Sequence, residues 1–318
     1  MSVGHIRKSG ENEKVGGFDG LGSIMAAAIV IIFTGMVFLR KGLVKKEDVQ
    51  SLNTLIIYLG MPSLIFLAVW QSDLSTDLIK IPILANATVL SCLVISSAVS
   101  RLMKLDRRSA GSFIIASAFG NTAFLGFPLI ISVFGRENLV YGVFYDQFST
   151  GILGLSLGAG LASWYGSGKG GVSGAWKNIV RFPPFWGLVL GFILRGYPIP
   201  EFLMTTLEYL SALVVPLVML VLGMSLRTES VGKLLSVSLV ASFIKLLVSP
   251  LILVLFSSFV TLETIPFQVS LLQASMPSMM MTLSFAIRYD LDTEMAAAII
   301  LVSLVLSTIT APFILSLF

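Results

Sequence analysis

The sequence predicts an all-α integral membrane protein with ten transmembrane helices, arranged as two inverted repeats of five helices each. Three observations predict this fold class. The 318 residues are 56% hydrophobic and only 12% charged, whereas soluble domains carry about 25% charged residues. Ten segments are apolar over much or all of the roughly 20 residues that a spanning helix requires. Prolines recur at matching places in the two halves, which indicates one five-helix unit used twice.

The ten expected spans are separated by short connections. The first is too long for the core of a signal peptide, so we expect it to be retained, and the sixth is short. The expected spans are residues 21–39, 49–70, 78–100, 111–133, 139–163, 181–196, 202–225, 233–258, 266–288 and 293–316. The resulting units are a disordered tail (1–20), a first five-helix repeat (21–163), a short cytoplasmic glycine-rich connector (164–178) and a second, inverted repeat (179–318).

The distribution of basic residues predicts the orientation. Of the 21 Lys and Arg residues, 14 lie in the loops that follow odd-numbered spans, and 6 lie in the tail or in the opposite loops. Short cytoplasmic loops carry the excess of Lys and Arg. We therefore expect these odd loops to be cytoplasmic and both termini to be extracytoplasmic, in a multi-pass protein of the cell membrane.

Interior prolines occur in spans two, four, seven and nine, at Pro62, Pro128, Pro216 and Pro277. Each proline lacks an N–H and crowds the carbonyl four residues earlier, at about 3 kcal/mol in a helix interior. Because five spans make each unit, the second unit enters the membrane from the opposite side. Inverted repeats with broken helices at corresponding positions are typical of secondary transporters. The alternative is that these prolines are ordinary kinks, which transmembrane helices tolerate.

Residue counts and missing motifs argue against an enzyme. The chain has one cysteine, Cys92, and one histidine, His5, which excludes an intrachain disulfide and sites that need two histidines. The Tyr-Asp pairs at Asp146 and Asp290 lack the Gly-x-Gly-Asp partner motif of intramembrane proteases. Ser242 lies three residues before Lys245, but the companion motifs of Ser-x-x-Lys enzymes are missing. We expect no cofactor and no nucleic-acid partner; a channel and a homodimer stay open.

Three stretches resemble the auxin efflux carrier family of membrane transporters, which is related to the bile-acid/sodium symporters. They are "GLVKKEDVQSLNTLIIYLGMPSLIF", "GNTAFLGFPLI" and "MPSMMMTLSFAIRYDLDTEMAAAIILVSLVLSTITAPF", and the resemblance covers nearly the whole chain after the tail. It implies ten helices in which the broken fourth and ninth helices cross at mid-membrane. It also implies an elevator-like motion of a transport domain against a scaffold, and organic-anion substrates such as auxin, malate or malonate.

Two departures from the family pattern narrow this expectation. Many members carry an asparagine soon after the second proline, where this chain has Met279, Met280 and Met281. The identity of the substrate on that side is therefore not implied by the resemblance. The long hydrophilic loop of many plant carriers is absent, which is typical of a compact prokaryotic member.

The candidate site is the interruption of span four within "AFGNTAFLGFPLI" and its counterpart in span nine. Broken helices offer free N–H groups, which favour anions, and free carbonyls, which favour cations. The expected substrate-binding residues are Gly120, Asn121, Thr122, Pro128, Gln273, Ser275, Met276, Pro277 and Ser278, and Pro62 and Pro216 are expected to break scaffold helices. A polar patch that merely holds helices together is the alternative.

Two charged residues inside the spans complete the candidate site. A membrane-buried ionisable group is a functional hypothesis by default, which applies to Lys245 and Asp146. We expect Lys245 near an end of a crossing helix and Asp146 as a proton site or as the counter-ion of Lys245. The runner-up function is sodium-coupled symport of a bile-acid-like anion, with oxygen atoms of Asn121, Thr122 and Gln273 around Na⁺. The sequence leaves proton and sodium coupling open.

Overall fold

A computed structural model describes residues 18–73, 75–166, 175–225 and 231–318, which form helices throughout, apart from one isolated β-bridge. Within these ranges, five helical stretches are long and apolar enough to cross a membrane: Glu47–Trp70, Asp77–Leu102, Glu201–Ser225, Val231–Ser257 and Thr293–Ser316. Shorter apolar helices cover Ala27–Arg40, Thr122–Phe134 and Pro183–Ile193. The prediction of a helical, multi-pass membrane protein is therefore confirmed. Residues 1–17 of the expected tail and 167–174 of the expected connector lie outside the described residues.

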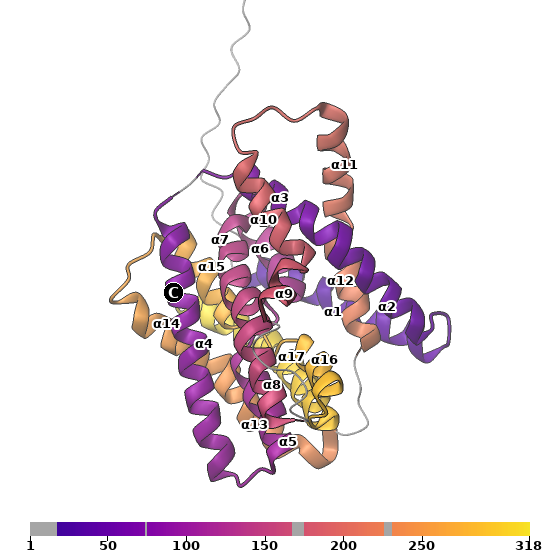
Figure 1. Cartoon of the computed structure of the whole chain (residues 1–318), viewed down its shortest axis with the longest axis vertical. Coiled ribbons are helices and arrows are strands. Elements are labelled where there is room, and N and C mark those ends of the chain that lie inside the picture. The colour runs from indigo at the N-terminus through magenta and orange to yellow at the C-terminus, as the bar shows by residue number, and fades with distance from the viewer. Residues whose placement is uncertain (1–17, 74, 167–174, 226–230) are drawn as a thin grey trace, which may run out of the picture.

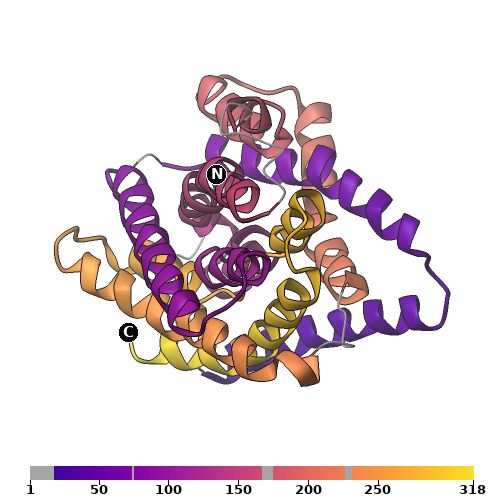
Figure 2. The ribbon, with the colours of Figure 1, turned by 60° about the horizontal axis from the view of Figure 1, so that its bottom comes forward.

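The helices pack into two groups (Figures 1 and 2). In the first group, α1 packs on α12 and α3 packs on α10, with α11 against α3. Its elements are α1 (Phe18–Arg40), α2 (Lys46–Leu55), η1 (Ile56–Gly60), α3 (Met61–Trp70), α10 (Pro183–Ile193), α11 (Glu201–Ala212) and α12 (Val214–Ser225). The short helix α9 (Ala175–Val180) lies between the groups, because it contacts α10 of this group and η4 (Gln147–Gly158) of the second.

The second group contains the long helices α4 and α17 together with the interrupted helices. Here α4 packs on α5 and α14, and α13 packs on α17. Its elements are α4 (Asp77–Leu102), α5 (Arg107–Ala118), η2 (Thr122–Gly126), α6 (Phe127–Phe134), η3 (Arg136–Asn138), α7 (Leu139–Asp146), η4 (Gln147–Gly158), α8 (Ala159–Tyr165), α13 (Val231–Phe243), η6 (Ile244–Val248), α14 (Ser249–Ser257), α15 (Thr264–Ala274), α16 (Met281–Tyr289) and α17 (Thr293–Ser316).

Most prolines inside the expected spans are accommodated in a helix that continues past them. A π-helical turn precedes Pro62, Pro128 and Pro250, and each proline is the second residue of the α-helix that follows. The wider turn accommodates the ring and the missing N–H. Pro62 is therefore not a helix break, and the chain is helical from α2 through α3. Before Pro216, only Leu213 separates α11 from α12, and its carbonyl still accepts from Leu217 N at 3.2 Å.

Glycines allow the closest helix contacts of the first group. A Cβ atom added to Gly223 of α12 would lie 1.8 Å from the carbonyl oxygen of Ile32 in α1. A Cβ atom added to Gly187 of α10 would lie 2.5 Å from the carbonyl oxygen of Pro62 in α3. Small residues allow close backbone approach where lipid provides no hydrophobic force between helices. The glycines therefore determine which helices of this group pair.

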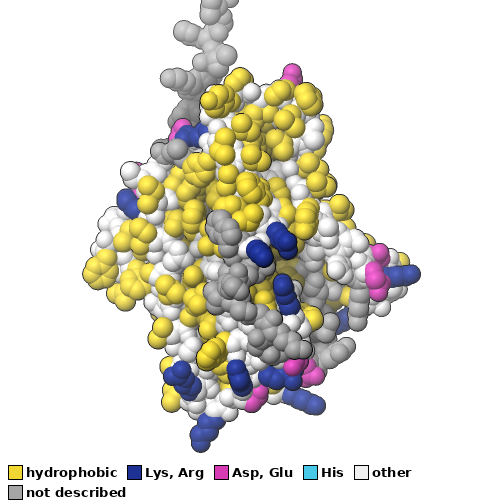
Figure 3. All heavy atoms as spheres, in the orientation of Figure 1, with side chains coloured by type: hydrophobic (Ala, Val, Ile, Leu, Met, Phe, Trp, Pro, Cys, Tyr) yellow, Lys and Arg dark blue, Asp and Glu magenta, His cyan; other side chains and the backbone are white. Residues whose placement is uncertain are grey.

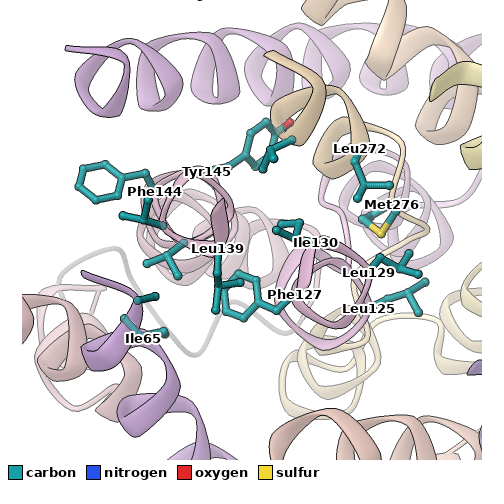
Figure 4. Packing of buried hydrophobic residues seen from close by; sticks show 14 of the residues in the cluster. Ile65, Leu125, Phe127, Leu129, Ile130, Leu139, Phe144, Tyr145, Leu272 and Met276 are labelled. Carbon is teal, nitrogen blue, oxygen red and sulfur yellow. The ribbon is translucent and has the colours of Figure 1, made fainter. Parts of the chain in front are cut away.

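The main hydrophobic core surrounds the second half of span four and the first half of span nine. Figure 4 shows Leu125, Phe127 and Ile130 of the η2–α6 segment lying between α7 and the end of α15. Phe127 and Ile130 are fully buried. Dispersion and apolar burial therefore fix the segment that follows the break, and the polar residues of the break are positioned by it.

Candidate functional site

Two interrupted helices cross at an antiparallel backbone pair. The first helix ends at Ala118, and Phe119 continues in extended conformation. Gly120 pairs with Ser278, Asn121 N donates to Pro277 O at 2.7 Å, and the Met279 amide donates to the Phe119 carbonyl at 2.9 Å. On one side of this crossing α5 packs on α16, and on the other side η2 and α6 pack on α15. Each side therefore combines the C-terminus of one half-helix with the N-terminus of another.

Lys245 reaches one of these C-termini from η6. Its Nζ atom donates to Ala274 O, the last carbonyl of α15, at 2.7 Å and lies 3.3 Å from Ser249 Oγ. Ser249 Oγ donates to the same carbonyl at 3.0 Å. The cation thus lies where the helix dipole is negative, which is favourable. Lys245 is 2% exposed, so it does not reach a headgroup or solvent.

Gly120 provides the space for this lysine. A Cβ atom at Gly120 would lie 3.0 Å from Lys245 Cε and 3.3 Å from Lys245 Nζ. Any larger residue would displace the ammonium group from the break. The absence of a side chain at Gly120 is therefore a steric requirement for the position of Lys245.

Asp146, the last residue of α7, lies on the other side of the same break. Its Oδ1 atom accepts from Thr122 Oγ1 at 2.6 Å and its Oδ2 atom accepts from Gln147 Nε2 at 2.9 Å. Thr122 Oγ1 also lies 2.9 Å from Thr150 Oγ1, which in turn is 3.4 Å from Gly120 O. Asp146 and Lys245 therefore both contact the break, but no ion pair within 4.0 Å joins them in the described part of the chain.

The amide side chains of the candidate site do not converge on one point. Gln273 Nε2 donates to Gly142 O at 3.2 Å, and its buried Oε1 atom has no hydrogen-bond partner in the described chain. A Cβ atom at Gly126 would lie 2.0 Å from that Oε1 atom. Thr122 instead faces Asp146, and the Asn121 side chain, 4% exposed, forms no hydrogen bond with the described residues. Because Gln273 and Thr122 face different neighbours, their oxygen atoms form no shared cluster among the described residues, and a sodium site here stays a prediction.

The other expected site residues are distributed around the crossing. Pro277 and Ser278 lie in the break itself, and Ser278 N donates to Ser303 Oγ at 3.1 Å. Ser275 closes the end of α15 by donating to Leu271 O at 2.8 Å, and Met276 is fully buried in the core. Pro128 lies beyond η2, inside α6.

Sequence reasoning missed the residues that support the two charges. Ser249 lies four residues after Lys245, and Thr150 lies four residues after Asp146. This spacing puts each pair on one helix face, so a search for polar residues one turn from each charge would have found both. Four more hydroxyl groups in the described chain are buried near the break or on adjoining helices without a hydrogen-bond partner, namely those of Ser117, Ser242, Ser278 and Thr282.

Comparison with known proteins identifies the family. The membrane transport protein family, which is auxin efflux carrier-like, matches residues 23–159 and 172–315. The chain belongs to this family. An uncharacterized transporter of Methanothermobacter thermautotrophicus is 33% identical over 298 residues, which cover 93% of this chain and 97% of that relative. The uncharacterized transporter MJ1031 of Methanocaldococcus jannaschii is 30% identical over 292 residues, which cover 88% and 93%.

Membership of this membrane transport family confirms the resemblance seen in the sequence. It makes the protein a transporter rather than an enzyme. Both relatives are archaeal and nearly fully covered, as expected for a compact prokaryotic-type member.

Proposed function

We propose that this membrane transport protein is a secondary-active carrier of small organic anions that holds the substrate carboxylate at the crossing of its two broken helices. The observation that carries the proposal is the meeting of three features at Gly120. The helix that starts at Thr122 directs its first N–H groups there, Lys245 contributes a buried ammonium group, and the Asn121 side chain has no hydrogen bond to the described chain. Together they provide a positive potential and hydrogen-bond donors for one carboxylate.

The charges at the crossing favour moderate rather than very tight binding of an anion. A charge at the bilayer centre costs about 2.5–3.5 kcal/mol even on the lenient insertion scale. Lys245 is partly neutralised by the Ala274 carbonyl, at 2.7 Å, and by the Ser249 hydroxyl, at 3.3 Å. The attraction left for a carboxylate is therefore moderate, which suits a carrier that must also release its substrate.

An inverted repeat of ten helices is supported by matching packing. The first helix, α1, packs on α12 of the second half, and α10 of the second half packs on α3 of the first. Span four is interrupted between Ala118 and Thr122, and span nine between Ala274 and Met281. Two copies of one unit, related by a pseudo-twofold axis in the membrane plane, would produce both the reciprocal helix packing and the matching breaks.

An elevator motion is supported by the division into two helix groups. The boundary between them includes contacts of α1 with α6 and α17, α3 with α7, α12 with η2, and α9 with η4. Of these elements, α3, α6, α7 and α12 carry no charged residue apart from Asp146, which is turned toward the break, and the charged residues of α1, Asp19 and Arg40, lie at its two ends. Arg136 Nη1 donates to Ser211 Oγ across the boundary at 3.1 Å. Apolar surfaces can slide past one another without leaving buried charges unpaired.

The surface supports the proposed orientation. Figure 3 shows basic side chains at the lower end of the molecule, in the centre of this face, and together with acidic ones at the tip where α1 and α2 meet, while hydrophobic side chains cover most of the upper part. The connection between α4 and α5, at the lower end of Figure 1, carries Lys104, and the helix ends beside it carry Arg101, Arg107 and Arg108. The positive-inside rule then assigns that end to the cytoplasm and both termini to the opposite side, in the cell membrane.

Transport into proteoliposomes tests the proposal. Radiolabelled malonate, malate and indole-3-acetate are offered with and without Na⁺ and pH gradients, and with unlabelled anion inside. Saturable uptake that is accelerated by internal anion identifies a carrier, whereas linear flux without exchange identifies a channel. Asn121→Asp places a carboxylate beside the proposed anion and should abolish uptake, while the matched variant Asn138→Asp, in the turn before α7, should retain it. If both variants take up the anion equally well, the substrate carboxylate does not bind at the crossing.

A further inference from the structure

We propose that Asp146 binds one proton when the crossing binds an anion, and that the Thr122 hydroxyl transmits one event to the other. This inference rests on the proposed function, because it requires an anion at the crossing. Beyond that function, it identifies the proton as the coupling ion and Asp146 as the residue that binds it.

The contacts of Asp146 differ from those of the other buried carboxylate that the structure describes near a cation. Asp77 is 2% exposed, but its Oδ1 atom accepts from Lys80 Nζ at 2.7 Å, so its negative charge is paired. Asp146 is 3% exposed, and its two oxygen atoms accept only from the neutral groups of Thr122 and Gln147. A buried charge without a cationic partner is expensive, and a proton removes that charge.

The titratable groups around Asp146 are few. Of the elements packed against α7, the segments α3, η2, α6, η4 and α15 carry no Asp, Glu, Lys, Arg or His. The next element, α4, carries the Asp77–Lys80 ion pair at its start, Cys92, which lies near Lys245, and Arg101 in its last turn. Tyr145 precedes Asp146 and is buried, and Arg136 with Glu137 lies at the far end of α7. Lys245 is therefore the cation with which Asp146 shares the break.

The charges of these two residues determine the stoichiometry. With Lys245 protonated and Asp146 ionised, the described interior of the crossing carries no net charge. A carboxylate that enters adds one negative charge in a region of low dielectric constant. Uptake of one proton by Asp146 restores neutrality. Anion binding and proton binding therefore favour each other, and each must change the affinity for the other by the same factor.

The Thr122 hydroxyl provides the link because it has one hydrogen to donate. While Asp146 is ionised, Thr122 donates to its Oδ1 atom at 2.6 Å. When a hydronium ion transfers a proton to Oδ1 and leaves as water, the new O–H group donates to Thr122 Oγ1, and no covalent bond other than O–H forms or breaks. The Thr122 hydrogen is then released from Asp146 and can turn to Thr150 Oγ1, 2.9 Å away, or to the anion at the start of η2. A hydroxyl group can reverse in this way because it is both donor and acceptor.

Calorimetry in buffers of different ionisation enthalpy tests the proposal on the purified full-length protein in lipid nanodiscs. Acetate, malonate, malate and indole-3-acetate serve as probes, and the number of protons taken up per bound anion is measured. The wild-type protein should take up one proton more than Asp146→Asn, whose amide group can donate to Thr122 as the protonated acid does. As the pH rises, the anion affinity of the wild-type protein should fall by up to about tenfold per pH unit, whereas the anion affinity of Asp146→Asn should stay nearly constant.

Two further variants separate the link from the proton site. Thr122→Val, which is nearly isosteric, should lose the proton uptake that accompanies binding, whereas Thr122→Ser should keep it. Asp290→Asn, at an exposed carboxylate near the end of α16, is the matched control and should behave as the wild type. Anion binding with the same proton uptake in wild type and Asp146→Asn overturns this inference and leaves the carrier function intact. No binding of any probe overturns the carrier function, and this inference with it.

Discussion

Replacing Lys245 by methionine should remove anion transport while leaving the fold nearly as stable. The stability change is small because two effects oppose each other. The variant loses a hydrogen bond to the Ala274 carbonyl that is worth about 1.5–3 kcal/mol, but it no longer buries an ammonium group, which costs several kcal/mol. The Ala274 carbonyl also keeps the Ser249 hydroxyl as a partner at 3.0 Å. Methionine is a flexible side chain that fills the space left by the lysine.

The effect on the anion is much larger. Lys245 Nζ lies 3.3 Å from the position of a Cβ atom on Gly120, so a carboxylate against this glycine would lie about 4 Å from the ammonium group. At an effective dielectric constant of about 20, that attraction is about 4 kcal/mol. Its loss weakens binding about a thousandfold.

The assay combines calorimetric binding of malonate, exchange in proteoliposomes, and thermal unfolding of the same preparations. Lys233→Met, at an exposed lysine of α13, is the matched control and should transport as the wild type. The double variant Lys245→Met with Asp146→Asn carries no charge at the crossing, so it should bind better than Lys245→Met alone. Transport by Lys245→Met at the wild-type rate would refute the assignment of this cation to the anion site.

Three further predictions concern the fold that holds the site. Gly126→Ala should lower stability by about 1–3 kcal/mol, because its Cβ atom would lie 2.0 Å from Gln273 Oε1; pairing it with Gln273→Ala should recover part of the loss in thermal unfolding. Gly223→Ala should lower the unfolding temperature by separating α12 from α1, and Gly232→Ala, with nothing within 4 Å, should not. Asp106→Ala should cost about 0.5–2 kcal/mol at neutral pH by removing the N-cap of α5. Hydrogen bonds from the Ser109 side chain and from backbone N–H groups lower the pKa of Asp106, so its contribution should be lost as the pH falls through that lowered pKa.

The helices themselves were predictable from the sequence because lipid imposes a simple rule. Every expected span coincides with a helical stretch whose limits lie within a few residues, apart from the breaks in spans four and nine. In lipid a backbone must satisfy its hydrogen bonds within the segment, so apolar length alone determines where helices form. The location of the two breaks was also predictable, because Gly120 with Asn121 and Pro277 are unfavourable in a continuous helix.

Proline alone was a poor guide to which helices break. Pro62 and Pro128 both follow π-helical turns, and so does Pro250, which the sequence argument did not consider. A π-helical turn depends on how the neighbouring helices pack, which no local pattern records. What distinguishes a true break is a partner strand: Gly120 is unwound because it pairs with Ser278, more than 150 residues away in the sequence.

The sequence was enough to propose roles for the charged residues Asp146 and Lys245. It did not show whether their side chains contact each other. Asp146 and Lys245 lie in different halves of the chain, and their positions along it do not indicate whether they touch. The structure gives each its own neutral partners: Asp146 contacts Thr122 just after the break in span four, and Lys245 lies beside Gly120 within it. In a direct ion pair, Lys245 and Asp146 would neutralise each other and leave little attraction for a substrate. In the proposed carrier, charges held apart by hydroxyl and carbonyl groups stay available, one to an anion and the other to a proton. Under that proposal, the separation of Lys245 from Asp146 is the feature of this crossing that explains how a neutral, membrane-buried site accepts a charged substrate.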